Sequence, residues 1–246
     1  MSKTVFITGA SSGIGEYLAY AYAKRGYSIG LFARRTDVLE EVKTKCESLG
    51  GSAIIFSGDV TDEAKVVTSI NNFVENFGHI DILYANAGIG AADPIWKGET
   101  KDVHRVLNIN INGVVNTVFA ATPHMVKQKS GKIAVISSVA GFRGLPRHGA
   151  YSGSKAAVRT MADGWRYDLT PNNIQITTIH PGFIKTPMVD NNGFMPFLMD
   201  VDIAAEKIIN AMESGKKSYI FPWQWRLVIP FFKIVPDALI NAVYKR

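Results

Sequence analysis

Residues 4–15 of the chain read TVFITGASSGIG, and this stretch decides the fold. The first five residues are apolar or β-branched and predict a short buried strand. A glycine-rich turn follows, and the alanine- and tyrosine-rich run 17–23 then predicts a helix that leads to a second apolar strand. A strand, glycine turn, helix and strand within about 30 residues form the setting that a dinucleotide-binding fingerprint requires. The glycines Gly9, Gly13 and Gly15 are therefore predicted to form a phosphate-binding turn, with a plain tight turn as the alternative.

The turn is expected to bind a pyrophosphate for two reasons. Glycine lets the backbone approach the ligand closely, and the start of a helix offers unpaired N–H groups with positive partial charge. The residues expected to contact the cofactor here are Gly9, Ser11, Ser12, Gly13, Ile14 and Gly15.

Strand-like and helix-like patterns alternate to about residue 186. This alternation predicts a single α/β domain over 1–246, built as a doubly wound, Rossmann-like parallel sheet with helices on both faces. Ligands of such sheets bind at the carboxyl ends of the strands. The predicted strands are 3–8, 28–33, 53–57, 80–84, 132–137 and 174–179, and the predicted helices between them include 36–49, 62–77, 103–127 and 151–168.

The end of the second predicted strand bears on the choice of cofactor. An acidic residue here would bind the ribose hydroxyls of NAD. Instead, Ala33 is followed by Arg34 and Arg35, and a guanidinium group suits a phosphate dianion. We predict NADP(H) rather than NAD(H), with Arg34 binding the 2′-phosphate and Arg35 assisting. Two solvated arginines at the start of a helix are the alternative.

Small or polar residues follow the other predicted strands at their carboxyl ends. Asp59 could cap the next helix or lie beside an adenine ring. The small residues after the fourth strand would let a cofactor lie close to the backbone. Beyond the turn and the two arginines, the expected cofactor contacts are Asp59, Val60, Asn86, Ala87, Gly88, Tyr151, Lys155, Pro181, Gly182, Ile184 and Thr186.

Tyr151 and Lys155 lie one turn apart on one face of a predicted helix. An ammonium close to a phenol favours the phenolate and lowers its pKa from about 10 toward neutrality. Such a pair can donate or accept a proton near pH 7. The spacing alone is common on solvated helix faces, so its significance depends on the strand-end residues described above.

The predicted helix 103–127 contains four asparagines, an unusual density of amides in an apolar element. Because buried amides need hydrogen-bond partners, at least one of them is expected to belong to a network. These residues are Asn108, Asn110, Asn112 and Asn116.

Together these motifs resemble the short-chain dehydrogenase/reductase family, in its compact single-domain branch. The resemblance spans residues 3 to about 187, in the family's order. The matching motifs are Thr8-Gly9-x-x-x-Gly13-x-Gly15, Asn86-Ala87-Gly88, Asn110-x-x-Gly113, Ser138, Tyr151-x-x-x-Lys155 and Pro181-Gly182.

The resemblance implies catalytic roles for four residues. Tyr151 would be the general acid in carbonyl reduction and the base in alcohol oxidation, while Lys155 would lower its pKa and bind the nicotinamide ribose. Ser138 would orient the substrate oxygen and stabilise its developing charge. Asn110 would hold a water that relays protons from Lys155. Asn112 is the other candidate for that role, but only Asn110 stands three residues before the motif glycine.

The chain departs from the family's pattern at two positions. Ala85 stands where the family commonly has asparagine, a change too small to disturb cofactor binding. Ser12 stands where some NADP-using members have a basic residue, so the NADP(H) prediction depends on Arg34 and Arg35 alone.

Two classes of function follow. The first is an NADP(H)-dependent oxidoreductase acting on a small carbonyl compound or secondary alcohol, expected to be apolar. The second is a non-catalytic NADP(H)-binding sensor or scaffold. The complete set of Asn110, Ser138, Tyr151 and Lys155 favours the enzyme, because a protein that only binds the cofactor needs no proton relay.

Two later segments carry further predictions. The range 186–200 is rich in methionine and phenylalanine and predicts a mobile lid over an apolar substrate, with a loop packed on the core as the alternative. The range 219–246 is aromatic and basic. It suits subunit contact in a homo-dimer or tetramer, or peripheral membrane contact through 221–246.

Composition narrows the remaining possibilities. The net charge is +6, yet no zinc-finger or aromatic RNA-binding motif accompanies it, so we expect no nucleic-acid partner. One cysteine excludes an intramolecular disulfide, and five scattered histidines predict no metal site. The N-terminus resembles no signal peptide and no apolar run is long enough to span a bilayer, which favours a cytoplasmic location with membrane association left open.

Overall fold

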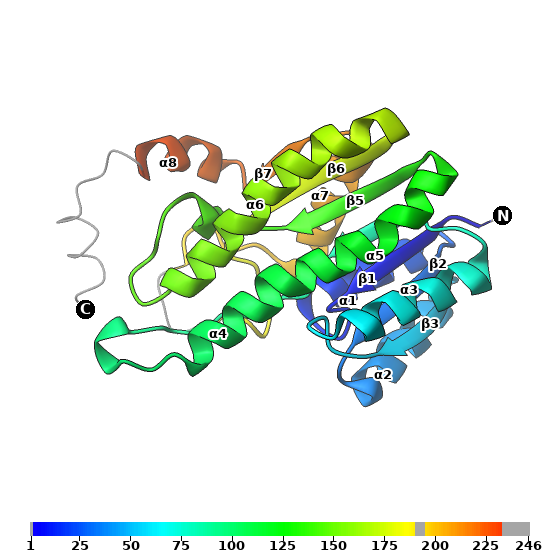
Figure 1. The fold of residues 1–246 in the computed structure, drawn as a ribbon, viewed down its shortest axis with the longest axis horizontal. Helices are drawn as coiled ribbons and strands as arrows, with labels where there is room; N and C mark the ends of the chain where they lie inside the picture. The colour runs from blue at the N-terminus through cyan, green and yellow to red at the C-terminus, as the bar shows by residue number, and fades with distance from the viewer. Residues whose placement is uncertain (1, 190–194, 233–246) are drawn as a thin grey trace.

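The computed structural model describes residues 2–189 and 195–232. Within these residues, seven parallel strands form one sheet in the order β3-β2-β1-β4-β5-β6-β7, with helices on both faces (Figure 1). This confirms the predicted doubly wound α/β fold. The strands are β1 (Thr4–Thr8), β2 (Ser28–Ala33), β3 (Ser52–Ser57), β4 (Ile82–Ala85), β5 (Gly131–Ile136), β6 (Ile174–Pro181) and β7 (Ser218–Phe221).

The helices follow the strands in the order that the alternating pattern predicts. The α-helices are α1 (Gly13–Ala23), α2 (Thr36–Ser48), α3 (Glu63–Phe77), α4 (Lys101–Leu107), α5 (Gly113–Gln128), α6 (Gly149–Leu169), α7 (Val201–Glu213) and α8 (Gln224–Phe232). The shorter helical turns are η1 (Ile95–Lys97), η2 (Asn108–Asn112), η3 (Val139–Phe142) and η4 (Thr170–Asn172).

Two hydrophobic cores hold the layers together, one on each face of the sheet. Helices α1, α2 and α7 pack on one face. Helices α3, α5 and α6 pack on the other. Every residue of β1 and of β2 is buried, because both strands are covered on both faces. This is why these strands are continuous apolar runs rather than alternating ones.

The sheet reverses its winding between β1 and β4. Strand β1 pairs with β2 on one side and with β4 on the other. Helix α1, which leads from β1 to β2, and helix α3, which leads to β4, cover opposite faces of the sheet. A crevice forms at the carboxyl ends of the strands where the winding reverses, and this is where ligands of such sheets bind.

The structure differs from the prediction in the long helix 103–127. It is divided into α4, the π-helical turn η2 and α5. A π-helical turn widens the helix locally and changes the direction in which the following side chains point. The regular 3.6-residue pattern of the sequence gives no signal for it.

Strand β7 and helices α7 and α8 follow residue 186, where the alternating pattern of the sequence ends. Strand β7 is a short edge strand paired with β6 alone among the described residues. The proposed lid, 186–200, is described except for residues 190–194. Its two ends lie together, since Met199 N donates to Phe183 O over 3.0 Å and Lys185 N donates to Met199 O over 2.9 Å. The last part of the aromatic C-terminal segment, 233–246, lies outside the described residues.

Candidate active site

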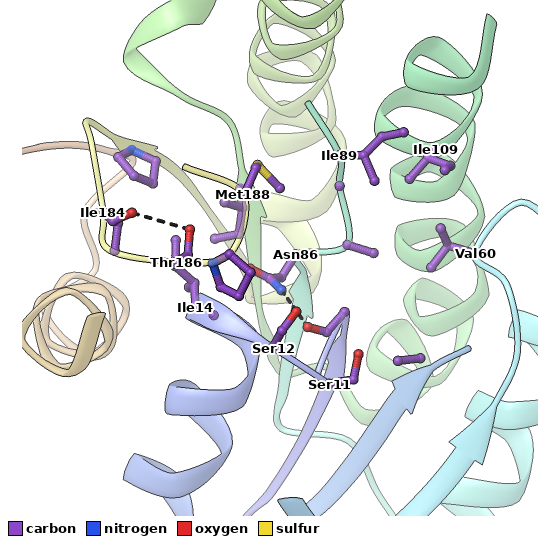
Figure 2. Close-up of a pocket in the computed structure, with 18 of the residues that line it drawn as sticks. Ser11, Ser12, Ile14, Val60, Asn86, Ile89, Ile109, Ile184, Thr186 and Met188 are labelled. Carbon is purple, nitrogen blue, oxygen red and sulfur yellow. Dashed lines mark hydrogen bonds between the residues drawn. The ribbon is translucent and has the colours of Figure 1, made fainter. Parts of the chain in front are cut away.

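A cavity of about 310 Å³ lies at the carboxyl ends of the strands. Every predicted cofactor-binding position except Gly15 lines it, and Ser138 lines it as well. Figure 2 shows that its labelled lining residues come from several separate segments of the chain. These labelled residues are Ser11, Ser12, Ile14, Val60, Asn86, Ile89, Ile109, Ile184, Thr186 and Met188.

The glycine turn has the geometry of a cradle for a ligand. Gly9 and Gly13 have φ values of +69° and +58°, which residues with a side chain rarely adopt. A Cβ on Gly15 would lie 2.3 Å from the carbonyl oxygen of Gly9. Gly15 therefore lets α1 pack against the turn and does not itself line the cavity. Ser12 is the N-cap residue of α1, but its side chain accepts no hydrogen bond from the first N–H groups of this helix.

The ends of β1 and β4 are tied together beneath this turn. Asn86 Nδ2 donates to Thr8 O over 2.9 Å, and Asn86 N donates to Thr8 Oγ1 over 3.1 Å. A Cβ on Gly9 would lie 2.9 Å from Ala87 Cα. The turn and the segment after β4 thus form one closely packed wall, and the residues present fit a dinucleotide laid across it.

Both arginines line the cavity next to the glycine turn. Arg35 donates through one guanidinium nitrogen to Ser11 Oγ over 3.0 Å and to Ser11 O over 3.2 Å. Arg34 lies 3.5 Å from a carboxylate oxygen of Asp59. Asp59 also accepts from Thr61 N and Thr61 Oγ1, so it closes a turn after β3. It does not cap the next helix, because Asp62 is the N-cap residue of α3.

Ser138 and Tyr151 both line the cavity, and the Ser138 side chain lies close enough to the phenol to affect its pKa. Lys155 is buried behind them, its Nζ donating to Ile136 O over 2.9 Å and lying 5.8 Å from the centroid of the Tyr151 ring. Two elements bring this group together: Ser138 follows β5, and the other two side chains lie in the first two turns of α6.

The pKa of Tyr151 differs from the expectation. Burial raises the pKa of this phenol above its ordinary value of 10.0, and the hydrogen bond from Ser138 lowers it by less. Burial also lowers the pKa of Lys155 to about 8. The predicted lowering of the Tyr151 pKa is therefore wrong for this structure, because desolvation of the phenol outweighs the lowering by Ser138.

Asn110 is fully buried and does not line the cavity. Its Oδ1 accepts from Ile89 N over 2.8 Å, and its Nδ2 donates to Ile89 O and Ser154 Oγ over 2.9 and 3.0 Å. The π-helical turn η2 carries it to this position. Asn112 instead donates to the side chain of Asn108 on the exposed face, which distinguishes the two candidates.

The sequence analysis missed Asp93, which fixes the start of α6. Its carboxylate accepts from Gly149 N over 2.9 Å and also from Ala150 N. Its own N–H donates to Arg147 O over 2.7 Å. Because Tyr151 follows Ala150 directly, Asp93 holds the turn that carries the phenol. The two partners are 56 residues apart in the chain, so no local pattern could reveal the contact.

The apolar part of the cavity wall was predicted only in part. Met188 belongs to the proposed lid, but the sequence analysis did not identify Ile89 and Ile109 as lining residues.

In the described part of the chain, no group of three or more His, Cys, Asp and Glu could hold a metal ion. Likewise, none of the described helices is long and apolar enough to cross a bilayer.

Comparison with known proteins identifies the family. A family model described as short chain dehydrogenase matches residues 3–195. An uncharacterized oxidoreductase of Myxococcus xanthus is 34% identical over 245 residues, which cover 99% of this chain and 97% of that protein.

Two solved structures have closely similar folds. A short chain dehydrogenase from Mycobacterium paratuberculosis bound to NAD has a TM-score of 0.82 at 26% identity, with 89% of this chain and 95% of that one covered. An alcohol dehydrogenase from Thermococcus sibiricus complexed with 5-hydroxy-NADP has a TM-score of 0.82 at 26% identity, with 90% and 96% covered.

This chain therefore belongs to the short-chain dehydrogenase family, as its motifs predicted, and it is an oxidoreductase that uses a nicotinamide dinucleotide. One of these two neighbours holds NAD and the other an NADP derivative, so membership of the family does not decide between the cofactors.

A first prediction concerns Asp93. Asp93→Ala should lower the free energy of unfolding by about 1–2 kcal/mol, because two N–H groups at the start of α6 lose their acceptor. Hydrogen exchange at the amides of Gly149 and Ala150 should become faster. Asp102→Ala is the matched control, since that exposed aspartate pairs only with Arg105, also exposed, and its loss should cost less than about 0.5 kcal/mol. Equal effects of the two substitutions would contradict the role of Asp93.

A second prediction concerns the buried ammonium. The pKa of Lys155 is about 8 in the folded protein against 10.5 ordinarily, so the unfolded state binds more protons between these values. The free energy of unfolding contributed by Lys155 therefore rises as the pH increases through this window. Lys155→Met removes the titration. The free energy of unfolding of Lys155→Met minus that of wild type should then fall by up to about 1.4 kcal/mol per pH unit from about pH 8 upward.

Denaturant unfolding at a series of pH values measures this difference. Lys127→Met, on the exposed face of α5, is the control and should show a difference from wild type that does not change with pH. A flat difference for Lys155→Met would show that the ammonium is not destabilised by burial.

Proposed function

We propose that this protein is an NADP(H)-dependent oxidoreductase that transfers hydride between the nicotinamide and an apolar carbonyl compound or secondary alcohol. Tyr151 is its general acid and base. The observation that carries the proposal is the pair of hydroxyls, Ser138 and Tyr151, on the wall of a cavity with a buried lysine behind them.

The proton chemistry follows from the properties of these side chains. Hydride addition to a carbonyl, which the bound nicotinamide supplies, leaves an alkoxide that needs a hydrogen-bond donor and a proton. The raised pKa of Tyr151 keeps the phenol protonated near neutral pH, so it can give up this proton. The Ser138 hydroxyl donates to the developing oxyanion. In alcohol oxidation the same residues act in reverse.

Lys155 and Asn110 are proposed to return the proton to Tyr151. An ammonium has three donors, and Lys155 uses one of them on Ile136 O, which leaves the others for a ribose hydroxyl or a water. A Cβ on Gly88 would lie 3.2 Å from Asn110 Oδ1 and 3.2 Å from Lys155 Nζ, so these two polar atoms approach the same glycine. We propose that the relay water joins them near Gly88.

The preference for NADP(H) is proposed from the arginine end of the cavity. Arg34, Arg35 and Ser11 lie together after β2 and in the glycine turn. Two guanidinium groups and a hydroxyl suit a 2′-phosphate, and no acidic residue stands at the end of β2 to bind a free ribose. Asp59 lies 3.5 Å from Arg34, and we propose that it orients this guanidinium.

The apolar substrate is proposed from the lining of the cavity near the hydroxyl pair. Ile89, Met188 and Val189 contribute to this lining, and the last two belong to the first part of the proposed lid. Movement of the lid remains part of the proposal.

Nothing in the comparisons supports the alternative of a non-catalytic sensor or scaffold, and turnover of a substrate would exclude that alternative.

Subunit contact is a further part of the proposal. On the outer face of α5 and α6, exposed Phe119 packs edge-on against Trp165 with ring centroids 5.7 Å apart. An exposed phenylalanine on a half-buried tryptophan suits a homo-dimer or tetramer contact. Peripheral membrane contact is taken up below, and a cytoplasmic location remains an expectation from the sequence.

A third prediction tests the cofactor. Arg34→Ala together with Arg35→Ala should weaken NADPH binding by at least about tenfold and NADH binding far less, because only NADPH has the phosphate that these charges bind. Fluorescence titration measures both affinities. Arg34→Ala alone is informative, since Arg35 also holds the glycine turn through Ser11. Arg105→Ala is an exposed control. Equal losses for both cofactors would overturn the proposed preference.

A fourth prediction tests the chemistry. Tyr151→Phe should reduce turnover by about 10²–10⁴-fold while NADPH binding stays near wild type, because the ring remains and only the proton donor is lost. The assay follows NADPH oxidation with a panel of apolar ketones and aldehydes. Tyr167→Phe, on the exposed face of the same helix, is the control. Retained turnover in Tyr151→Phe would end the acid–base assignment. Tight binding without turnover by wild type on every substrate would favour the sensor.

A further inference from the structure

Two groups of large apolar side chains are exposed at the end of the molecule that holds the cavity. The first lies along α8 and the residue before it: Trp223, Leu227 and Phe231 are 63%, 59% and 62% exposed and recur every four residues. The second is the η1 turn, where Ile95 and Trp96 are 90% and 70% exposed. Single exposed apolar residues are ordinary, but a helical stripe and a second cluster at one end indicate a binding surface.

The inner side of helix α8 packs against the rest of the protein, so the exposed side chains on its outer side face solvent. Trp225 and Ile229, on the inner side, are buried in a cluster with Val139 of η3. Trp225 also packs on the loop after β6, because a Cβ on Gly182 would lie 2.2 Å from its Nε1. The Phe197 ring of the lid meets it edge-on, with centroids 5.9 Å apart.

Both groups are connected to the region of η3 and the loop that follows it. Helix α8 contacts η3, and the loop after η3 carries Arg147 to Trp96, with the guanidinium carbon 5.6 Å from the centre of the indole ring. Figure 1 shows α8 and the beginning of α4 toward the same end of the molecule as the carboxyl ends of the strands. Helix α8 is also next to the cavity, because Trp225 packs on Gly182, which lines it.

The charges of these segments are predominantly positive. Residues 93–101, 143–148 and 222–232 contain two acidic residues, Asp93 and Glu99, and the first is engaged with the start of α6. The basic residues of the same segments are Lys97, Lys101, Arg143, Arg147 and Arg226. A basic rim around exposed Trp, Leu and Phe is typical of proteins that bind an anionic membrane surface.

We propose that this end of the molecule, which we call the docking surface, binds an anionic lipid bilayer. Trp96, Trp223, Leu227 and Phe231 enter the interfacial layer, and the basic residues lie against the headgroups. A second copy of the chain is the other occupant that the surface could take. A two-fold contact would place the basic rim against itself, whereas anionic lipid neutralises it.

The docking surface bears on how substrate reaches the site. With the cavity beside the bilayer, an apolar carbonyl compound can enter from the lipid without crossing water. This consequence rests on the proposed function, but lipid binding does not, and the two can be tested separately.

The experiment is co-sedimentation of the full-length protein with vesicles of phosphatidylcholine alone, and of phosphatidylcholine mixed with phosphatidylglycerol. Wild type should bind the anionic vesicles and bind them less at high salt, because salt screens the basic rim. Trp223→Ser together with Leu227→Ser should reduce binding by about tenfold or more. Tyr167→Ser, which removes an exposed aromatic ring from the far end of α6, should bind as wild type does.

Cofactor titration and size-exclusion chromatography of each variant complete the test. Unchanged NADPH affinity shows that the variants are folded, and loss of turnover without loss of vesicle binding would count against the proposed function alone. Absence of wild-type binding to anionic vesicles would overturn the proposal. A smaller oligomer for Trp223→Ser/Leu227→Ser, with no lipid binding by wild type, would identify the docking surface as a subunit contact instead.

Discussion

The site depends on a buried ammonium group. Lys155 lies inside the protein with a single backbone acceptor, Ile136 O, at 2.9 Å, and among the described residues no carboxylate forms an ion pair with it. Burial of an ammonium is unfavourable, as its lowered pKa records. The helix that carries it must therefore be held in place from several sides. Ser137 Oγ donates to Lys155 O over 2.8 Å, and Gly141 leaves no room for a Cβ against the same stretch of backbone.

The same principle governs the cofactor side of the cavity, where close backbone contact replaces side chains. Thr8, Gly9, Gly15 and Asn86 draw the ends of β1 and β4 together at the point where the sheet reverses its winding. A larger residue at Gly9 would push the turn away from the segment after β4, and one at Gly15 would push α1 away from the turn. The cavity therefore exists because small residues stand where the elements converge, and Asp93 extends this bracing to α6 from outside the cavity.

The sequence was sufficient for the fold and for the positions of most site residues, because both depend on local patterns. Buried strands are apolar runs, and residues at their carboxyl ends meet at one edge of a parallel sheet, so Arg34, Ser138 and Gly182 could be placed without coordinates. Contacts between distant segments left no such pattern. Asp93 at α6, the Ile136 carbonyl at Lys155 and the π-helical turn at Asn110 all depend on packing.

The error over the Tyr151 pKa has the same origin. Spacing predicts that a lysine lies near a tyrosine, but not how much water surrounds the phenol or where on the ring the ammonium lies. Desolvation is a property of the packed site, and here it exceeds the stabilising contact with Ser138. The consequence is useful chemically, because a phenol that keeps its proton at neutral pH is a donor ready for an alkoxide. Trp225 of α8 packs on the loop of Gly182 at this same cavity, so the element that presents the proposed docking surface also braces one wall of the site.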